Sequence, residues 1–448
     1  MNQQRVQKSM RTSIRTVAAS LGLAAALFSV GCGGGGSSSS TQAPPPAGSQ
    51  GSKSYNYVGT QSLDASYGAG GFNYKYGGTW AITLDDATNY FSYQNIGHNT
   101  ASATVGTTSG SGFASLTAST AGATPGAGGY VLEIPGEAAL LRPGDDTVAP
   151  VISAVTNGCP NLSGNVTYQF ISLGTPAKTD KNTHVAYGSV EASNSGTVWN
   201  FTNLNMYTFG GVALSPAPLP VGNCGYTEVG YAVSMAPSTA TNGFTVTTAV
   251  SPNGFFIMDQ GQGEPGNVDV LDTAGGGSGS FGATGPLGLV GVEKPSSALS
   301  TSSIVAGKYL GFEFDAINLT LGRVGSMPVA FGQTAGSGTV MTGGAFPNDD
   351  VTQSAPSNIT VDLGQQDSSN NGLYKSVTVT LPDVYGGCIA EPYGGVDANG
   401  NPTCIFQGEA VVGNPNGKFA IFITVNDLSQ AGSHYTADAA LDFFLYQQ

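Results

Sequence analysis

Residues 79–84 are TWAITL, and this stretch decides the fold class because apolar side chains alternate with small or polar ones at every position. Alternation with a period of two is typical of a β-strand that is buried on one face. The same period returns at 130–134, 166–170, 244–250 and 376–381. We therefore expect the body of the chain to consist of β-strands.

Tight turns separate these alternating stretches. Asn-Gly pairs occur at 157–158, 242–243, 253–254, 371–372, 399–400 and 416–417. Asn and Gly tolerate the positive φ angles that two-residue hairpin loops need, so such pairs join neighbouring antiparallel strands. The sequence therefore predicts an all-β fold of antiparallel sheets, sandwich-like or barrel-like, with few short helices.

Two further strand features carry specific predictions. Residues 419–425, FAIFITV, are apolar on both faces, which is typical of a central strand rather than an edge strand. Between Gly311 and Leu321 the apolar side chains change parity, and one inserted residue near Asp315 or Ala316 would cause that change. We predict a β-bulge there.

Helical signal is sparse, and internal repetition is open. One or two short turns fit 295–310, and another fits 426–431. The stretches 251–259 and 413–422 both place Pro-Asn-Gly before an aromatic strand. This similarity indicates either an internal repeat or a common hairpin turn that is used twice.

The N-terminus has the layout of an export signal. Four cations and no acid lie within the first 15 residues, and an apolar stretch follows at 16–30. That stretch is shorter than the ~20 residues that span a bilayer, which favours a cleaved signal over a permanent anchor. Ser29, Val30 and Gly31 then lead directly to Cys32.

On these residues the N-terminus resembles bacterial lipoprotein precursors, in which small residues precede a cysteine that is acylated and becomes the new N-terminus. The resemblance implies that 1–31 is a signal peptide and that Cys32 is the lipidation site, carrying acyl chains such as palmitate. It also implies a bilayer as partner and a location in the bacterial envelope. Because Gly33 and not Asp follows Cys32, the resemblance favours the outer membrane.

The segment after Cys32 predicts a tether. Its sequence, GGGGSSSSTQAPPPAGSQGSKS, has no aromatic residue and no aliphatic residue larger than Ala, so it cannot offset the entropy of ordering. We expect a lipidated and disordered tether over 32–54. A β unit at 55–273, a Gly-rich loop or linker at 274–285 and a β unit at 286–448 follow, the two units either separate or packed as one domain.

The chain has five cysteines, and Cys32 leaves an even set of four in the body. An even set suits two disulfides in an oxidising compartment. Three connectivities are possible, and we favour Cys159 with Cys224 and Cys388 with Cys404.

Charge and ligand spacing limit the partners. The formal net charge is −14, which disfavours nucleic acid because its phosphates would be repelled. Asp397, Asn399 and Asn401 sit at alternate positions and are the candidate ligands for calcium, but Gly400 does not fall where an EF-hand loop places its glycine. We expect neither a metal nor another cofactor.

Catalytic motifs are lacking in the sequence, which contains no GxSxG, HExxH or GxxxxGK[ST] pattern. A glycosidase would need two carboxylates in one cleft, and Glu313 and Asp315 are the candidates because they lie on a predicted strand. Both alternate with Phe312 and Phe314, as the outward polar face of a strand would.

Aromatic residues crowd the start of the body. Tyr74, Tyr76 and Trp80 are candidates for a surface that binds a glycan or a protein, and the alternative is that alternation buries them in the core. The sequence as a whole favours a membrane-anchored envelope lipoprotein with a non-enzymatic binding or structural role. The alternative is a carbohydrate-active hydrolase that uses paired carboxylates.

Overall fold

The computed structural model confirms an all-β fold in which every strand pairing is antiparallel. It describes residues 52–59, 79–85, 90–95, 100–107, 113–118, 130–134, 136–142, 151–155, 158–173, 185–209, 211–214, 218–227, 230–236, 246–260, 288–318, 323–346, 357–382, 394–396, 399–426 and 440–448. For the first five strands it describes the backbone alone. All these residues belong to one compact unit, Gln42–Gln448.

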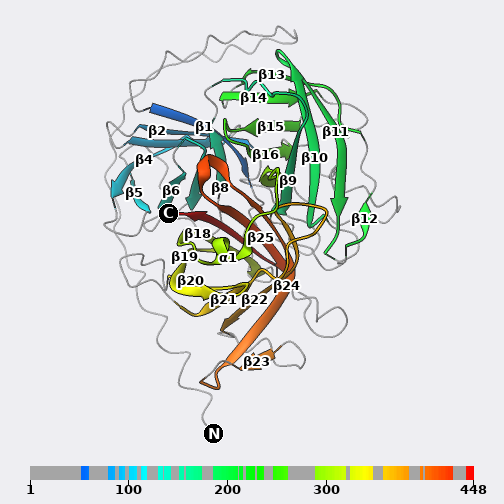
Figure 1. Ribbon diagram of the computed structural model, residues 1–448. Coiled ribbons are helices and arrows are strands. Elements are labelled where there is room, and N and C mark those ends of the chain that lie inside the picture. The colour runs from blue at the N-terminus through cyan, green and yellow to red at the C-terminus, as the bar shows by residue number, and fades with distance from the viewer. Residues whose placement is uncertain are drawn as a thin grey trace, which may run out of the picture. The chain divides into compact units, whose positions relative to one another are not determined.

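The first barrel is a closed ring of the eight N-terminal strands, drawn blue to cyan in Figure 1. Its strands are β1 (Ser52–Gly59), β2 (Thr79–Asp85), β3 (Tyr90–Asn95), β4 (Thr100–Thr107), β5 (Ala114–Ala118), β6 (Tyr130–Ile134), β7 (Ala138–Arg142) and β8 (Val151–Val155). Each strand pairs with the next one along the chain, and β1 returns to pair with β8.

The second barrel follows the same path with the next strands, green in Figure 1. They are β9 (Val166–Leu173), β10 (Tyr187–Ser195), β11 (Val198–Tyr207), β13 (Gly222–Thr227), β14 (Gly230–Met235), β15 (Val246–Val250), β16 (Phe255–Gln260) and β17 (Gly288–Glu293). Pairing of β17 with β9 and of β10 with β11 closes these eight strands into a ring. The short β12 (Ala213–Leu214) adds to one edge of β11.

The third barrel repeats the arrangement, in yellow to red. Its ring contains β18 (Tyr309–Asn318), β19 (Arg323–Ser337), β20 (Val340–Ala345), β21 (Ile359–Asp362), β22 (Leu373–Pro382), β24 (Pro402–Gly413), β25 (Ala420–Asn426) and β26 (Ala440–Gln447). Pairing of β26 with β18 and of β22 with β24 closes it, and β23 (Gly394–Val396) pairs with the start of β24.

Several strand predictions are confirmed. FAIFITV supplies β25, which lies between β24 and β26 and is buried from Ala420 to Val425. The register of β18 against β19 shifts between Asp315 and Asn318, where the bulge was predicted. Positive φ angles occur at the Gly of the pairs at 253–254, 371–372, 399–400 and 416–417.

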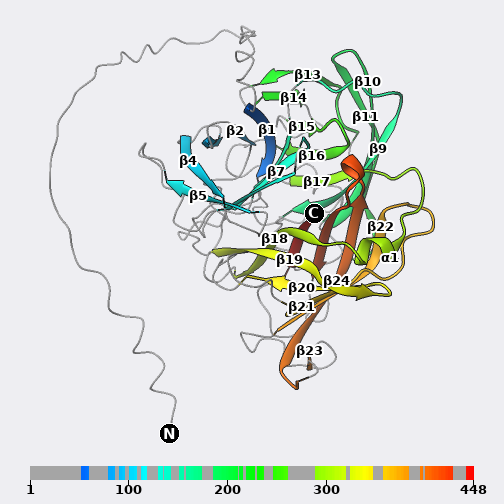
Figure 2. The same ribbon diagram turned by 60° about the vertical axis from the view of Figure 1, so that its left-hand side comes forward.

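Both faces of many strands are buried, because each barrel has its own interior and the barrels also pack against one another. One apolar cluster draws on all three barrels, with Ile134 from the first, Phe255 from the second and Phe422 from the third. The rings of Phe255 and Phe422 meet edge to face at 5.3 Å. In Figure 2 the third barrel lies below β16 and β17 of the second barrel.

The connecting segments confirm one helix and leave other predictions open. A short helix, α1 (Thr301–Val305), lies within 295–310 as predicted, whereas 427–431 and the Gly-rich 274–285 lie outside the described residues. The strands on either side of 274–285, β16 and β17, pair directly with each other. Among the described residues no helix is long and apolar enough to cross a membrane.

The two Pro-Asn-Gly stretches occupy equivalent places in their barrels. Residues 251–254 join β15 to β16, and 414–419 join β24 to β25. In each ring these are the sixth and seventh strands in chain order. The equivalence favours an internal repeat over independent use of one turn type.

Candidate functional site

The structure describes only part of the site that the sequence predicted. Cys32, Tyr74 and Tyr76 lie outside the described residues, so lipidation and the aromatic surface stay predictions. Trp80 is in β2, where its backbone lies opposite Tyr57 and Asn95.

The predicted outward position of Glu313 is wrong. Its side chain is 4% exposed, in a strand whose opposite face carries the fully buried Phe312. The alternation could not reveal this, because β18 is covered on one face by the barrel interior and on the other by the junction between barrels. Asp315 pairs with Gly325 and Leu441 through the backbone, and its side chain is not among those described.

The calcium candidates lie in the hairpin that joins β23 to β24. Asn399 and Asn401 are exposed there, and Asp397 is outside the described residues. Within the described part of the chain, no group of three or more His, Cys, Asp or Glu side chains is arranged to hold a metal ion.

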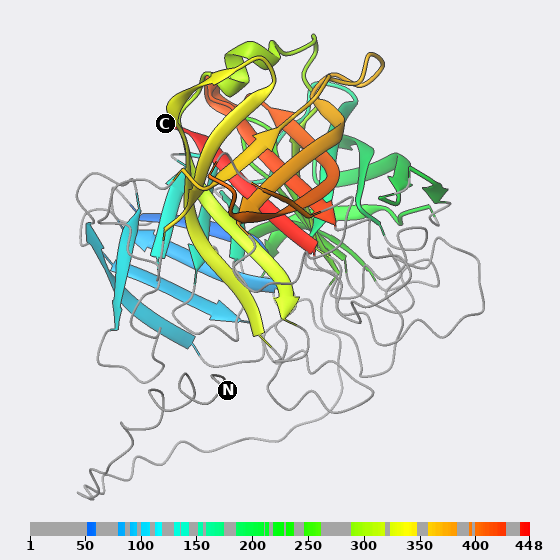
Figure 3. The same ribbon diagram turned by 90° about the horizontal axis from the view of Figure 1, so that it is seen from below.

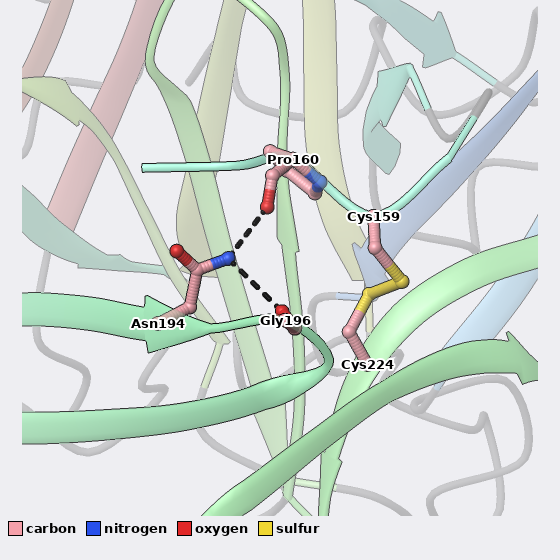
Figure 4. The surroundings of a disulfide bond; sticks show 5 residues. All are labelled: Cys159, Pro160, Asn194, Gly196 and Cys224. Atoms are coloured by element: carbon pink, nitrogen blue, oxygen red, sulfur yellow. Dashed lines mark hydrogen bonds between the residues drawn. A yellow bond between two sulfur atoms is a disulfide. The ribbon is translucent and has the colours of Figure 1, made fainter. Parts of the chain in front are cut away.

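The connector between the first and second barrels is fastened across the second barrel. A disulfide joins Cys159 to Cys224 on β13, which is the pairing we favoured (Figure 4). Asn194 at the end of β10 donates from Nδ2 to the Pro160 carbonyl at 2.8 Å and accepts from the Leu162 amide at 3.0 Å. Cys159 and Leu162 pack against the apolar interior of this barrel. We call residues 159–165 the disulfide plug.

The other disulfide stays partly a prediction. Cys404, at the start of β24, is disulfide-bonded. Its predicted partner, Cys388, lies outside the described residues.

The connector between the second and third barrels closes the third barrel without a covalent bond. Ile304 and Val305 of α1 are buried in the interior cluster of that barrel, and Figure 3 shows α1 at one of its ends. The Tyr309 hydroxyl donates to the Ile304 carbonyl at 2.7 Å, and the hydroxyls of Thr301 and Tyr374 are 3.1 Å apart. We call residues 294–308 the helix plug.

A loop between β21 and β22 holds the helix plug from outside. Gln366 Nε2 donates to the Leu299 carbonyl at 3.1 Å, and its Oε1 accepts from the Leu299 amide at 3.2 Å and from the Gly372 amide at 2.5 Å. Asn371 Nδ2 donates to the Pro295 carbonyl at 3.1 Å. Burial raises the pKa of the Tyr309 hydroxyl, and the nearby Tyr374 raises it further.

The same loop is ordered by one carboxylate. Asp367 Oδ1 accepts from the Ser369 amide and hydroxyl, and Lys375 Nζ lies 2.6 Å from Asp367 Oδ2. Hydrogen bonds from Lys375 and then from Ser369 hold the pKa of the Asp367 carboxyl well below its usual range. Sequence reasoning missed this group, and the available signal was the polar run QDSSNNG at 366–372.

The interior of the second barrel combines aromatic and sulfur side chains with isolated polar atoms. Tyr168 and Phe256 stack at 4.9 Å, and Trp199 and Phe201 at 6.0 Å. Within the described part of the chain, Trp199 Nε1 and Thr248 Oγ1 are buried and have no hydrogen-bond partner. The interior behind the disulfide plug is therefore the candidate functional site.

Comparison with known proteins adds no family. No protein-family model matches the chain, and no curated protein matches it. One similar solved structure is a double mutant of transferrin binding protein B from Haemophilus parasuis Hp5, with 12% identity, 89% of this chain and 76% of that chain covered, and a TM-score of 0.25. Another is isotype 1 transferrin binding protein B from serogroup B Neisseria meningitidis, with 12% identity, 89% and 77% coverage, and a TM-score of 0.27. Superposition this poor supports no conclusion about the present chain.

Proposed function

We propose that the chain is a non-enzymatic binding or structural lipoprotein of the bacterial envelope, held at the outer membrane by acylated Cys32. The observation that carries this proposal is the N-terminal layout of cations, apolar stretch, small residues and Cys32, followed by a polar tether. More than one acyl chain gives stable anchoring that a single chain does not give. The β-barrel body beyond the tether would then be presented near the membrane surface.

The use of buried carboxylates in the body supports a non-enzymatic role. Glu137, in the turn between β6 and β7, is fully buried, and its carboxylate accepts hydrogen bonds from Ser251 Oγ and Asn253 Nδ2 of the second barrel. This acid therefore fastens the first barrel to the second and does not face a cleft.

The described strands also show one pair of carboxylates on a shared sheet face. Glu409 lies opposite Thr424, which lies opposite Asp442, so all three side chains point to the same side. Phe422 and Phe444 on that face belong to the cluster between barrels. Glu409 is 3% exposed and Asp442 is 1% exposed, so a sugar chain does not reach them in this arrangement. We therefore do not propose the hydrolase.

The anchor is tested by cell fractionation of the full chain and its Cys32→Ser variant. We expect the unaltered chain in the outer-membrane fraction and in the detergent phase, with a mature mass that includes acyl chains, and the variant in neither. Unchanged partitioning and unchanged mass for Cys32→Ser would overturn the lipid anchor.

The non-enzymatic role is tested separately on the purified chain. We expect no turnover on a panel of glycosidase substrates. A glycan or protein array, screened under the same conditions, identifies any ligand that the chain retains. Turnover that is lost in Glu409→Gln or Asp442→Asn, with the circular dichroism spectrum unchanged, would contradict the proposal.

A further inference from the structure

Among the residues that the structure describes, two buried polar atoms inside the second barrel have no hydrogen-bond partner. Trp199 Nε1 is a donor only, whereas the Thr248 hydroxyl can donate or accept. Both residues are 0% exposed, and neither atom has a partner within the described part of the chain. A buried polar group without a partner costs roughly 1–3 kcal/mol, so its presence in a folded protein calls for an explanation such as a bound molecule.

Strand register places both atoms inside the ring and near the disulfide plug. Thr248 lies opposite Val233, and Val233 lies opposite Cys224, so all three side chains share the inward face. Trp199 lies opposite Asn194, the residue that holds the plug through Pro160 and Leu162. The unpartnered groups therefore share the inward face of the ring with Cys224 and Asn194, the two residues to which the plug is fastened.

The remaining interior is apolar and adaptable. Met206, Met235 and Met258 are fully buried there, three of the seven methionines in the chain. Methionine is flexible and polarizable, so a surface rich in it can repack around a guest. An eight-stranded barrel has an interior that side chains fill or that holds one small ligand.

The plug has the properties of a lid. It precedes β9 in the chain, and its described contacts with the barrel include one disulfide, the hydrogen bonds of Asn194, and the packing of Cys159 and Leu162 against the apolar interior. Cys159 is partly exposed, whereas Cys224 is 5% exposed. A dithiol reductant can attack Cys159 Sγ. The S–S bond then breaks, two protein thiols form, and the reductant is oxidised to its own disulfide with transfer of two electrons and two protons.

We propose that the interior of the second barrel is a binding compartment for a small, mostly apolar molecule that carries a hydrogen-bond-accepting oxygen, and that the disulfide plug is its lid. The oxygen would accept from Trp199 Nε1 and from the Thr248 hydroxyl, while the apolar part would contact the methionine and aromatic side chains. This inference rests on the binding role proposed above and names the ligand class for it.

The experiment uses prodan, a naphthalene fluorophore that carries a ketone, as the probe. Trp80 and Trp199 are the two tryptophans of the chain, so Trp80→Phe leaves Trp199 as the single indole reporter. We expect saturable quenching of Trp199 by prodan, with a blue shift of prodan emission. Absence of saturable quenching, both with the disulfide intact and after reduction, would show that the buried polar atoms meet water at most and would overturn the proposal.

Thr248→Val is the matched variant for the polar contact. Valine has nearly the same shape as threonine and lacks the hydroxyl, so the interior volume is kept. Loss of one hydrogen bond to the ketone should weaken prodan binding roughly fivefold, while the unliganded barrel loses no hydrogen bond and keeps its thermal midpoint. Equal affinity in Thr248→Val and in the parent would overturn the assigned contact.

The lid is tested by the rate of prodan entry. We expect the rate to rise several-fold after reduction with dithiothreitol, and to rise also in Asn194→Ala with the disulfide intact. Far-UV circular dichroism checks that the reduced chain keeps its β spectrum. If it does not, Asn194→Ala alone decides the test, and entry at the parent rate in that variant would overturn the lid.

These outcomes are independent of the anchor. Prodan binding concerns the second barrel of the purified chain, whereas membrane partitioning concerns Cys32. A chain that partitions through Cys32 and does not bind prodan would retain its proposed location and lose only this inference.

Discussion

The two plugs close successive barrels of the same type by different means. The disulfide plug depends on a covalent bond between residues 65 positions apart, supported by the hydrogen bonds of Asn194. The helix plug depends on several hydrogen bonds, among them those of Gln366 and Tyr309, and on burial of Ile304 and Val305. The covalent part of the first fastening can be removed by a single chemical step, whereas the second is undone only by losing several weak contacts together.

Glycine explains how the helix plug is seated without a covalent bond. At Gly332 on β19 the φ angle is +77°, and an added Cβ would lie 1.9 Å from the Gly307 carbonyl oxygen. Only glycine allows the strand and the plug backbone to approach this closely. In the third barrel this close backbone contact holds the plug against the strand, as the disulfide holds the plug against the barrel in the second.

The largest expected effect comes from removing the disulfide. Cys159→Ala with Cys224→Ala should lower the free energy of unfolding of the second barrel by about 4 kcal/mol, because the closed loop is long in the chain-entropy model. Urea unfolding followed by Trp199 fluorescence in a Trp80→Phe background measures it. If the free energy of unfolding of the third barrel fell by the same amount, the two plugs would not be independent.

A smaller effect is expected for the helix plug. Gln366→Ala removes three hydrogen bonds to Leu299 and Gly372, and we expect the third barrel to lose roughly 2 kcal/mol. Hydrogen exchange at the amides of α1 and β19 measures the local loss. Gln365→Ala, at the exposed neighbouring position, is the control and should change stability by less than about 0.5 kcal/mol.

The predictability of these two plugs from sequence differs for a physical reason. Four cysteines in the body allow only three sets of disulfide pairings, so the pairing of Cys159 with Cys224 could be favoured in advance. Gln366 and Leu299 are 67 residues apart and meet only because the third barrel closes, which no local pattern records.

Local sequence patterns predicted the strands better than they predicted what surrounds each strand. Alternation identified β22 and the bulge in β18, and a continuous apolar run identified β25, because those features depend on neighbouring side chains. Alternation placed Glu313 outward, because a strand between a barrel interior and a barrel junction is buried on both faces. In the candidate site, Thr248 lies at an inward position between Val246 and Val250, so a hydroxyl within an apolar stripe was the available signal.

Asn194 tests how much of the first fastening is not covalent. Asn194→Ala removes the hydrogen bonds to Pro160 and Leu162 while the disulfide remains, and we expect a loss of about 1.5 kcal/mol in the unfolding of the second barrel. Ser195→Ala at the exposed end of the same strand is the control. A loss near that of the disulfide variant would mean that the side chain, and not the covalent bond, holds the plug.

The smallest expected effect concerns pH and the loop that holds the helix plug. The folded pKa of the Asp367 carboxyl is lowered, chiefly by Lys375, so its stabilisation is present above the unfolded pKa of about 3.9 and is lost as pH falls through the folded value. Lys375 is 45% exposed, and solvent screening therefore limits the contribution to about 1 kcal/mol at neutral pH.

Asp367→Asn should remove this contribution and flatten the acid side of the stability profile, measured by urea midpoints of the third barrel between neutral pH and about pH 3. In the double variant with Lys375→Met, the second substitution should add little. The urea midpoint of the second barrel should not share this dependence on pH. If it fell with pH in the same way, and if Asp367→Asn abolished that fall, the loop would act on both plugs. The contrast between the two plugs would then not hold.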